Sequence, residues 1–182
     1  MKKVVLSTIL AFGLTSSLSA YELNGDFNLK WTGFKLASKV GVSGTFKTIN
    51  LDIKKSESLT EFLKSAKVKI DTKSLESNDA GRNSNIVSTI FSLASSETIE
   101  GTILSVDEAK NSLVLNLVMN QTTKPITMSY EIIDSKVVAK GVIDILDFNL
   151  ATSYKAFTEV CGALHENVSY SDVNIEFTLP FK

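Results

Sequence analysis

Apolar and polar residues alternate along several stretches of this chain, and that pattern limits the possible fold more than any other feature. Every second residue is apolar from Ile126 to Ile132, and again from Val173 to Phe181. Successive side chains of a β-strand point to opposite faces, so each stretch has one apolar and one polar side. The pattern predicts strands that place one face on a core and the other in water.

The number of such segments predicts an all-β fold with antiparallel pairing. About eight strands are expected, near residues 27–36, 44–54, 66–73, 98–106, 112–120, 125–133, 136–148 and 172–181. Turn residues at 107–111, 121–125 and 134–136 predict a meander of consecutive hairpins between residues 98 and 148. About eight antiparallel strands is the number at which a sheet closes into a small barrel, so we expect an eight-stranded antiparallel barrel.

Two short segments have helical rather than alternating spacing. Ser56–Lys64 carries Leu59, Phe62 and Leu63 on one side, and Asp79–Ala94 repeats its apolar residues at helical intervals. We expect these one or two short helices to cap the barrel. Residues 151–171 show neither period clearly and are expected to form an extended connection.

The first twenty residues have the layout of a secretory signal peptide. Lys2 and Lys3 precede an apolar run over residues 4–14, and small residues follow to Ala20. The apolar run is too short to span a bilayer as a mature helix. We expect cleavage after Ala20, or after Ser19 as a second choice, leaving one mature domain over residues 21–182 that is exported to the periplasm.

Composition argues against several classes of partner. Lys2 and Lys3 leave with the leader, so 17 of the 19 basic residues remain against 20 acidic ones, a net charge of −3. Arg82 is the only arginine, whereas nucleic-acid recognition usually relies on a basic face with several arginines. Cys161 is the only cysteine, so the fold cannot depend on an internal disulfide. We expect neither a nucleic-acid partner nor an integral membrane protein, and the sequence leaves a homodimer open.

No set of residues predicts a catalytic or metal site. Cys161 and His165 stand four residues apart, but zinc needs three or four protein ligands and the chain has no other cysteine or histidine. We therefore interpret them as a half-buried loop cysteine and an unrelated histidine, and expect no metal, no cofactor and no enzymatic activity. Asp144 and Asp147 lie on or at the end of a strand, where one could point inward, although surface solvation is the default for both.

The apolar faces of the strands allow two interpretations. Phe27, Leu29 and Trp31 share one face, and Leu115, Leu117 and Met119 share another. Such residues either fill the core, as in many small barrels, or line a dry cavity for an apolar ligand. Periodicity alone favours core filling. A membrane-spanning barrel also alternates, but several segments here are shorter than the roughly 9–11 residues that a spanning strand needs.

The order and spacing of several motifs resemble the YceI family of bacterial periplasmic proteins. The motifs are WTGFK at 31–35 with VSGTF at 42–46, IDTKSL at 70–75 with Arg82-Asn83 and Phe91, LNLVMNQTTKPI at 115–126, and Asp147-Phe148. The chain departs from the family pattern at Leu29 and near Asn85, where the family often has histidines, and at Gln121, where a glycine is usual.

The resemblance implies a lipocalin-like barrel that binds a polyisoprenoid or fatty-acyl chain. It therefore favours the interpretation that the apolar faces line a cavity over the interpretation that they fill the core. The residues expected to bind the ligand are Phe27, Leu29, Trp31, Phe34, Phe46, Ile86, Ile90, Phe91, Leu115, Leu117, Met119, Met128 and Phe148. Two alternatives remain. One is a filled barrel that acts through its surface as an interaction or stress-protective partner of membrane electron-transfer proteins. The other is a small enzyme that uses Asp144, Asp147 or Cys161.

Overall fold

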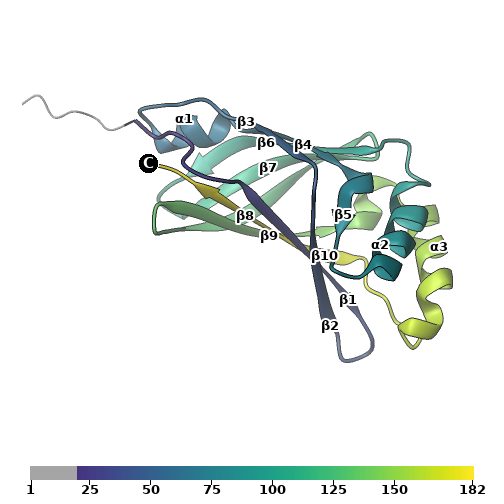
Figure 1. Ribbon diagram of the computed structural model, residues 1–182. Coiled ribbons are helices and arrows are strands. Elements are labelled where there is room, and N and C mark those ends of the chain that lie inside the picture. Colours follow the sequence, from purple (N-terminus) through teal and green to yellow (C-terminus); the bar gives the residue numbers. More distant parts are fainter. Residues whose placement is uncertain (1–19) are drawn as a thin grey trace, which may run out of the picture.

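One curled antiparallel sheet forms the frame of the protein, with helices at its two ends (Figure 1). The computed structural model describes residues 20–182. The strands are β1 (Asn28–Lys35), β2 (Val40–Phe46), β3 (Ile49–Asp52), β4 (Lys67–Asp71), β5 (Leu75–Glu76), β6 (Thr98–Asp107), β7 (Ser112–Met119), β8 (Thr122–Ile133), β9 (Lys136–Asp144) and β10 (Asp172–Pro180). Their order in the sheet is β3-β4-β6-β7-β8-β9-β10-β1-β2-β5, and every pair is antiparallel.

The predicted all-β antiparallel fold is confirmed, with ten strands in place of eight. The segment expected at 44–54 divides at Lys47 and Thr48 into β2 and β3. Strand β5 has only two residues, which is too short for an alternating pattern to be recognised in the sequence. β3 pairs with β4 at one edge of the sheet, whereas β2 pairs with β1 and β5 at the other. A single bent segment thus joins the two ends of the sheet and makes it curl.

The predicted meander is present as β6 to β9, but one of its turns lies earlier than expected. Asn120 and Gln121 form the turn with φ of 49° and 59°, and β8 already begins at Thr122. Paired positive φ angles fit the twist of a hairpin, and asparagine tolerates this region well. Pro125 therefore lies inside the strand. It can do so because β9 pairs with β8 only from Ser129 onward, so the ring occupies an unpaired edge.

Both predicted helices form, each beginning at a side-chain cap. Ser58 accepts a hydrogen bond from the Glu61 backbone N–H at the start of α1 (Leu59–Lys64). Asp79 accepts one from the Arg82 N–H at the start of α2 (Ala80–Ile86), which continues as a π-helical turn over Val87–Phe91. These caps satisfy backbone N–H groups that have no partner within the helix.

The extended connection expected at 151–171 is wrong. A third helix, α3 (Ala151–Cys161), occupies its first half, and 3₁₀ turns lie at Thr72–Ser74, Ile145–Phe148 and Gly162–Leu164. Tyr154, Phe157 and Cys161 are spaced for one helix face, but Val160 and Leu164 are exposed. Apolar residues on the solvent side blurred the amphipathic pattern that predicts a helix.

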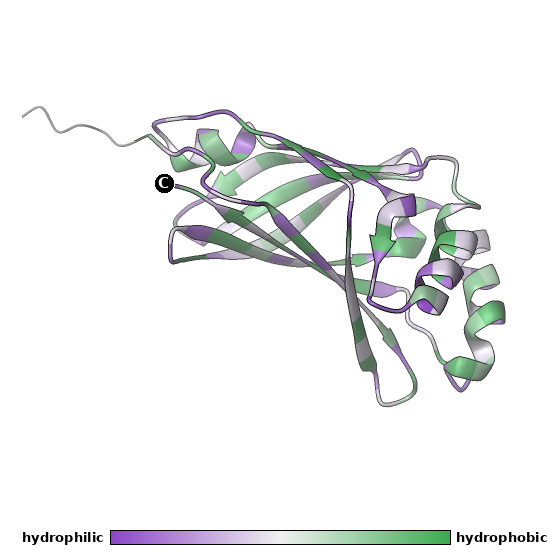
Figure 2. Ribbon diagram, in the orientation of Figure 1, coloured by the Kyte–Doolittle hydropathy of each residue, from purple (hydrophilic) through white to green (hydrophobic). Residues whose placement is uncertain are grey.

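The core is solid at the α1 end of the sheet. Phe62 and Leu63 of α1 are fully buried, and they share one hydrophobic cluster with Leu113 and Met128, each 1% exposed. α2 and α3 lie at the opposite end (Figure 1). Apolar and polar residues alternate along the strands between these ends, as Figure 2 shows by hydropathy.

The predicted leader of residues 1–20 falls, except for Ala20, outside the described residues. Within residues 20–182, none of the helices combines the length and apolar character needed to cross a bilayer.

Candidate functional site: an apolar cavity with a polar mouth

A cavity of about 480 Å³ lies inside the curled sheet, toward the end that α2 and α3 cover. Small-molecule sites in proteins are typically clefts of about 300–1,000 Å³ with mostly apolar walls. The strands β1, β4, β6, β7 and β10 contribute most of the wall, and α2 and α3 complete it. The interior of the sheet is therefore filled at one end and hollow at the other. Core filling describes the apolar faces at the first end, and cavity lining describes them at the second.

Most residues predicted to bind a ligand lie in the cavity wall. Eleven of the thirteen are there: Phe27, Leu29, Trp31, Phe34, Phe46, Ile86, Ile90, Phe91, Leu115, Leu117 and Met119. Met128 and Phe148 are not part of it, and they are 1% and 0% exposed. Met128 packs in the solid part of the core, opposite Leu113 of β7. Phe148 lies at the other end of the sheet, where it ends the 3₁₀ turn Ile145–Phe148 and its backbone oxygen accepts a hydrogen bond from Asn120.

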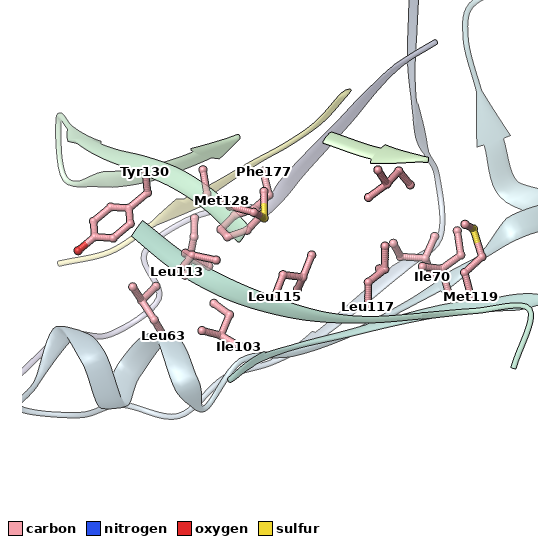
Figure 3. Packing of buried hydrophobic residues seen from close by; sticks show 14 of the residues in the cluster. Leu63, Ile70, Ile103, Leu113, Leu115, Leu117, Met119, Met128, Tyr130 and Phe177 are labelled. Carbon is pink, nitrogen blue, oxygen red and sulfur yellow. The ribbon is translucent and has the colours of Figure 1, made fainter. Parts of the chain in front are cut away.

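Strand β7 passes from the solid region into the hollow one. Leu113 lies near Leu63 of α1, and Leu115, Leu117 and Met119 follow along the strand toward the other end (Figure 3). The last three line the cavity, whereas Leu113 does not. One apolar face of one strand thus serves first as core and then as cavity wall.

A glycine on the inner face of β1 helps to keep the cavity open. Gly33 has the same strand parity as Leu29 and Trp31 and lines the cavity. A Cβ atom placed on Gly33 would meet no atom within 4 Å. The space that a larger residue would occupy between Trp31 and Lys35 therefore belongs to the cavity.

The indole of Trp31 is fixed against the neighbouring strand. Its Nε1 donates a hydrogen bond to the backbone oxygen of Thr45, at 3.2 Å. Gly44, opposite Trp31 in β2, leaves room for the ring, because a Cβ there would overlap the indole. A rigid aromatic side chain is thereby held in the cavity wall, where its fluorescence can report on what enters.

The cavity reaches solvent between α2 and the end of α3. Among its lining residues, only Asp79, Gly81 and Leu164 are largely exposed to solvent, with Leu164 64% exposed. Asp79 and Gly81 lie at the start of α2, and Leu164 ends the 3₁₀ turn after α3. We call this opening, defined by these three residues, the mouth of the cavity.

Polar side chains of the cavity wall gather near this mouth. Arg82 forms an ion pair with Asp79 at 3.4 Å, and its Nη1 donates to the backbone oxygen of Ser77 at 3.3 Å. The Arg82 backbone N–H, followed by the guanidinium charge, holds the pKa of Asp79 below its usual value. Lys35 and Asn85 also line the cavity at this end.

Cys161 and His165 both lie in the cavity wall near the mouth. The interpretation of Cys161 as a half-buried loop cysteine is wrong, because it is 3% exposed and ends α3. Burial raises the pKa of its thiol, against a smaller opposing effect of Asn85 and Lys35. Such a thiol stays protonated and is a poor nucleophile or metal ligand.

His165 is held as a neutral imidazole. Its Nδ1 lies 2.7 Å from the Ser169 hydroxyl, and its ring meets Phe157 edge-on, with centroids 5.6 Å apart. Burial, with the charges of Lys35 and Arg82, lowers the pKa of the imidazole. Within the described residues, no three histidine, cysteine or carboxylate side chains come together as a metal-binding group.

The two carboxylates considered for acid–base chemistry do not point inward. Asp144 is exposed and caps the 3₁₀ turn by accepting from the Leu146 N–H at 2.9 Å. Asp147 is exposed beside Lys124, 3.9 Å away. Neither lines the cavity, in agreement with surface solvation as the default for both.

Sequence reasoning missed two groups of wall residues. Val68, Ile70 and Ile175 lie in segments whose alternation was recognised, and extending the parity argument to them would have found them. Tyr154 and Phe157 belong to α3, for which the sequence has no clear helical period, so strand parity could not identify them as wall residues.

Solved structures of similar fold cover nearly the whole chain. A polyisoprenoid-binding domain from Saccharophagus degradans, described as implicated in plant cell wall breakdown, is 17% identical, with a TM-score of 0.60, over 90% of this chain and 98% of that one. Burkholderia cenocepacia BcnA is 15% identical, with a TM-score of 0.58, over 84% and 94%. The Campylobacter jejuni YCEI protein is 14% identical, with a TM-score of 0.52, over 100% and 99%.

At these identities the similarity concerns the fold. Comparison with curated protein sequences finds no match. The family model described as the YceI-like domain matches residues 12–181. This match over nearly the whole chain confirms the resemblance that the motifs indicated, and the chain belongs to the family of YceI-like domains.

Proposed function

We propose that this protein binds one long-chain lipid, of polyisoprenoid or fatty-acyl type, with the apolar tail inside the cavity. The observation that carries the proposal is the cavity itself, which has a mostly apolar wall and polar residues near its mouth. Burying a lipid chain contributes about 0.8 kcal/mol per CH₂. A tail of about ten carbons would thus gain about 8 kcal/mol, before the cost of immobilising it.

The fold family supports the same conclusion. The Saccharophagus degradans neighbour is described as a polyisoprenoid-binding domain, and its fold covers most of this chain. The proposed role is sequestration or carriage rather than catalysis, because the wall offers a protonated thiol and a neutral imidazole in place of an activated nucleophile. Export by the predicted leader would place this carrier in the periplasm.

The test is direct identification of a bound lipid. Organic extracts of gently purified native protein are examined by mass spectrometry for a stoichiometric lipid. Delipidated protein is then titrated with geranylgeraniol and with hexadecanol while the fluorescence of Trp31 is followed. Saturable binding of either supports the proposal. Folded protein that carries no lipid and responds neither to these neutral probes nor to the anionic probes farnesyl phosphate and palmitate refutes it, and would favour a protein that acts through its outer surface.

A further inference from the structure

We propose that the mouth selects amphiphiles whose head group is anionic, a phosphate or a carboxylate, and that Lys35 makes the principal contact with that head group. This inference rests on the proposed function, since it concerns the polar end of a ligand whose tail fills the same cavity. It is carried by the position of Lys35 and by the balance of charge around the mouth.

Lys35 projects from the cavity side of β1. It has the same strand parity as Leu29, Trp31 and Gly33, and it lies in the cavity wall. It ends β1, and its backbone forms an isolated bridge with Ser169 beside the segment that follows α3. The ammonium is close enough to Cys161, His165 and Asp79 to influence each of them electrostatically, so it lies at the mouth and not in the solid core.

Lys35 has no ion-pair partner in the part of the chain that the structure describes. Among residues 20–182, no carboxylate lies within salt-bridge distance of it. Asp79, the carboxylate at the mouth, is paired with Arg82. Glu176 also borders the cavity, but it alternates with the inward Ile175 and Phe177 and pairs with Lys140 at 3.5 Å. With His165 neutral, the mouth keeps one net positive charge.

A bound ligand changes the surroundings of this charge. Lys35 is half-buried, so part of its side chain is accessible to water. A ligand that fills the cavity displaces that water, and losing hydration without a compensating partner disfavours a charged group. An anionic head group restores the lost interaction, whereas a neutral one leaves the ammonium poorly solvated. Selectivity thus arises because an anionic head group gains binding free energy from the ammonium, whereas a neutral ligand loses binding free energy by desolvating it.

Matched pairs of probes test this selectivity. Farnesyl phosphate is compared with farnesol, and palmitate with hexadecanol, by Trp31 fluorescence on delipidated protein. We expect each anionic member to bind at least tenfold more tightly than its neutral partner, the equivalent of about 1.4 kcal/mol. A larger ratio in the first pair assigns a phosphorylated isoprenoid, and a larger ratio in the second assigns a fatty acid.

Three variants assign the selectivity to Lys35. Lys35→Met keeps an unbranched side chain without charge and should bring both ratios close to one, while neutral probes bind at least as well as before. Lys35→Glu should bind the anionic probes more weakly than the neutral ones. Lys30→Met is the matched control, because Lys30 is exposed on the opposite face of the same strand. It should leave the ratios unchanged.

The outcomes separate the two proposals. Equal binding within both pairs by the wild type overturns the head-group inference and leaves the apolar cavity as the binding site. Lys35→Met must be folded, with a thermal midpoint like that of the wild type. If this variant still binds the anionic probes tenfold more tightly than the neutral ones, the assignment to Lys35 is wrong. Absence of saturable binding for all four probes removes the proposed function itself.

Discussion

Filling the cavity from Gly33 should abolish most ligand binding without harming the fold. A side chain at this position enters open space, since a Cβ there meets nothing within 4 Å. Gly33→Leu adds four carbon atoms and should displace about as many carbons of a bound chain. At about 0.8 kcal/mol per carbon, the loss is about 3 kcal/mol, or roughly a hundredfold in the dissociation constant. Gly33→Ala adds one carbon and should weaken binding only about fourfold.

The stability of these variants should move in the other direction. Glycine inside a strand is unfavourable by roughly 0.5–1 kcal/mol relative to alanine, so both replacements should keep or raise the thermal midpoint. Lys30→Leu adds an apolar side chain of the same size on the outer face of β1 and should leave binding unchanged. The assay is titration of delipidated protein with geranylgeraniol, followed through Trp31 and checked by calorimetry.

A graded loss from alanine to leucine, with the fold intact, supports the cavity as the binding place. If folded Gly33→Leu binds geranylgeraniol as tightly as the wild type, the ligand does not occupy the space beside Gly33, and the reasoning fails.

Three further predictions follow from the contacts of single residues. Cys161→Ser should shift the thermal midpoint only slightly, and the wild-type thiol, buried and with a raised pKa, should react slowly with iodoacetamide and still more slowly when geranylgeraniol is bound. The ion pair with Lys47 and hydrogen bonds from the Asn83 side chain and the Asn78 backbone lower the pKa of Glu76 to about 2. Its carboxylate therefore stabilises the fold above a pH of about 4.5, and this stabilisation is lost as the pH falls toward 2. Glu76→Gln should lower the urea midpoint at pH 7 and match the wild type near pH 2. Gly44→Ala should lower the free energy of unfolding by about 1–3 kcal/mol and change the Trp31 emission, because its Cβ lies 2.5 Å from the Glu76 carbonyl oxygen as well as against the indole.

The sheet could be predicted because strand alternation is a local property with a strong physical cause. Seven of its segments were located within a few residues, and the turns predicted at 107–111 and 134–136 lie between hairpin strands of the meander. The division of the segment at 44–54 could not be seen, because a change of pairing partner at Lys47 leaves no trace in the local sequence. The helix α3 was hidden for a different reason, since its solvent side carries the exposed Val160 and an exposed leucine, Leu164, follows its end.

Parity identified the cavity wall well but could not set its limits. Met119 and Met128 lie on apolar faces of adjacent strands and looked equivalent in the sequence. In the structure Met119 lines the cavity, whereas Met128 lies against Gly141, where a Cβ would come within 2.9 Å of its Cγ. Whether the space in front of a residue is filled depends on how the helices pack on the finished sheet, which strand parity does not show.

The polar mouth shows what a parity argument can still recover. Leu29 and Trp31 indicate the inner face of β1. Every second residue after them, Gly33 and then Lys35, is expected on the same face. A lysine on an apolar face departs from the pattern, and charged residues are rarely buried without a partner, so its presence predicts either a strand end at solvent or a ligand of opposite charge. The structure places Lys35 at a strand end and also in a cavity wall, with no carboxylate within salt-bridge distance among residues 20–182, so its position is compatible with both explanations and leaves room for the proposed anionic head group. A charge at the end of an otherwise apolar face is therefore the feature of this sequence that best indicates where a bound lipid would present its head group.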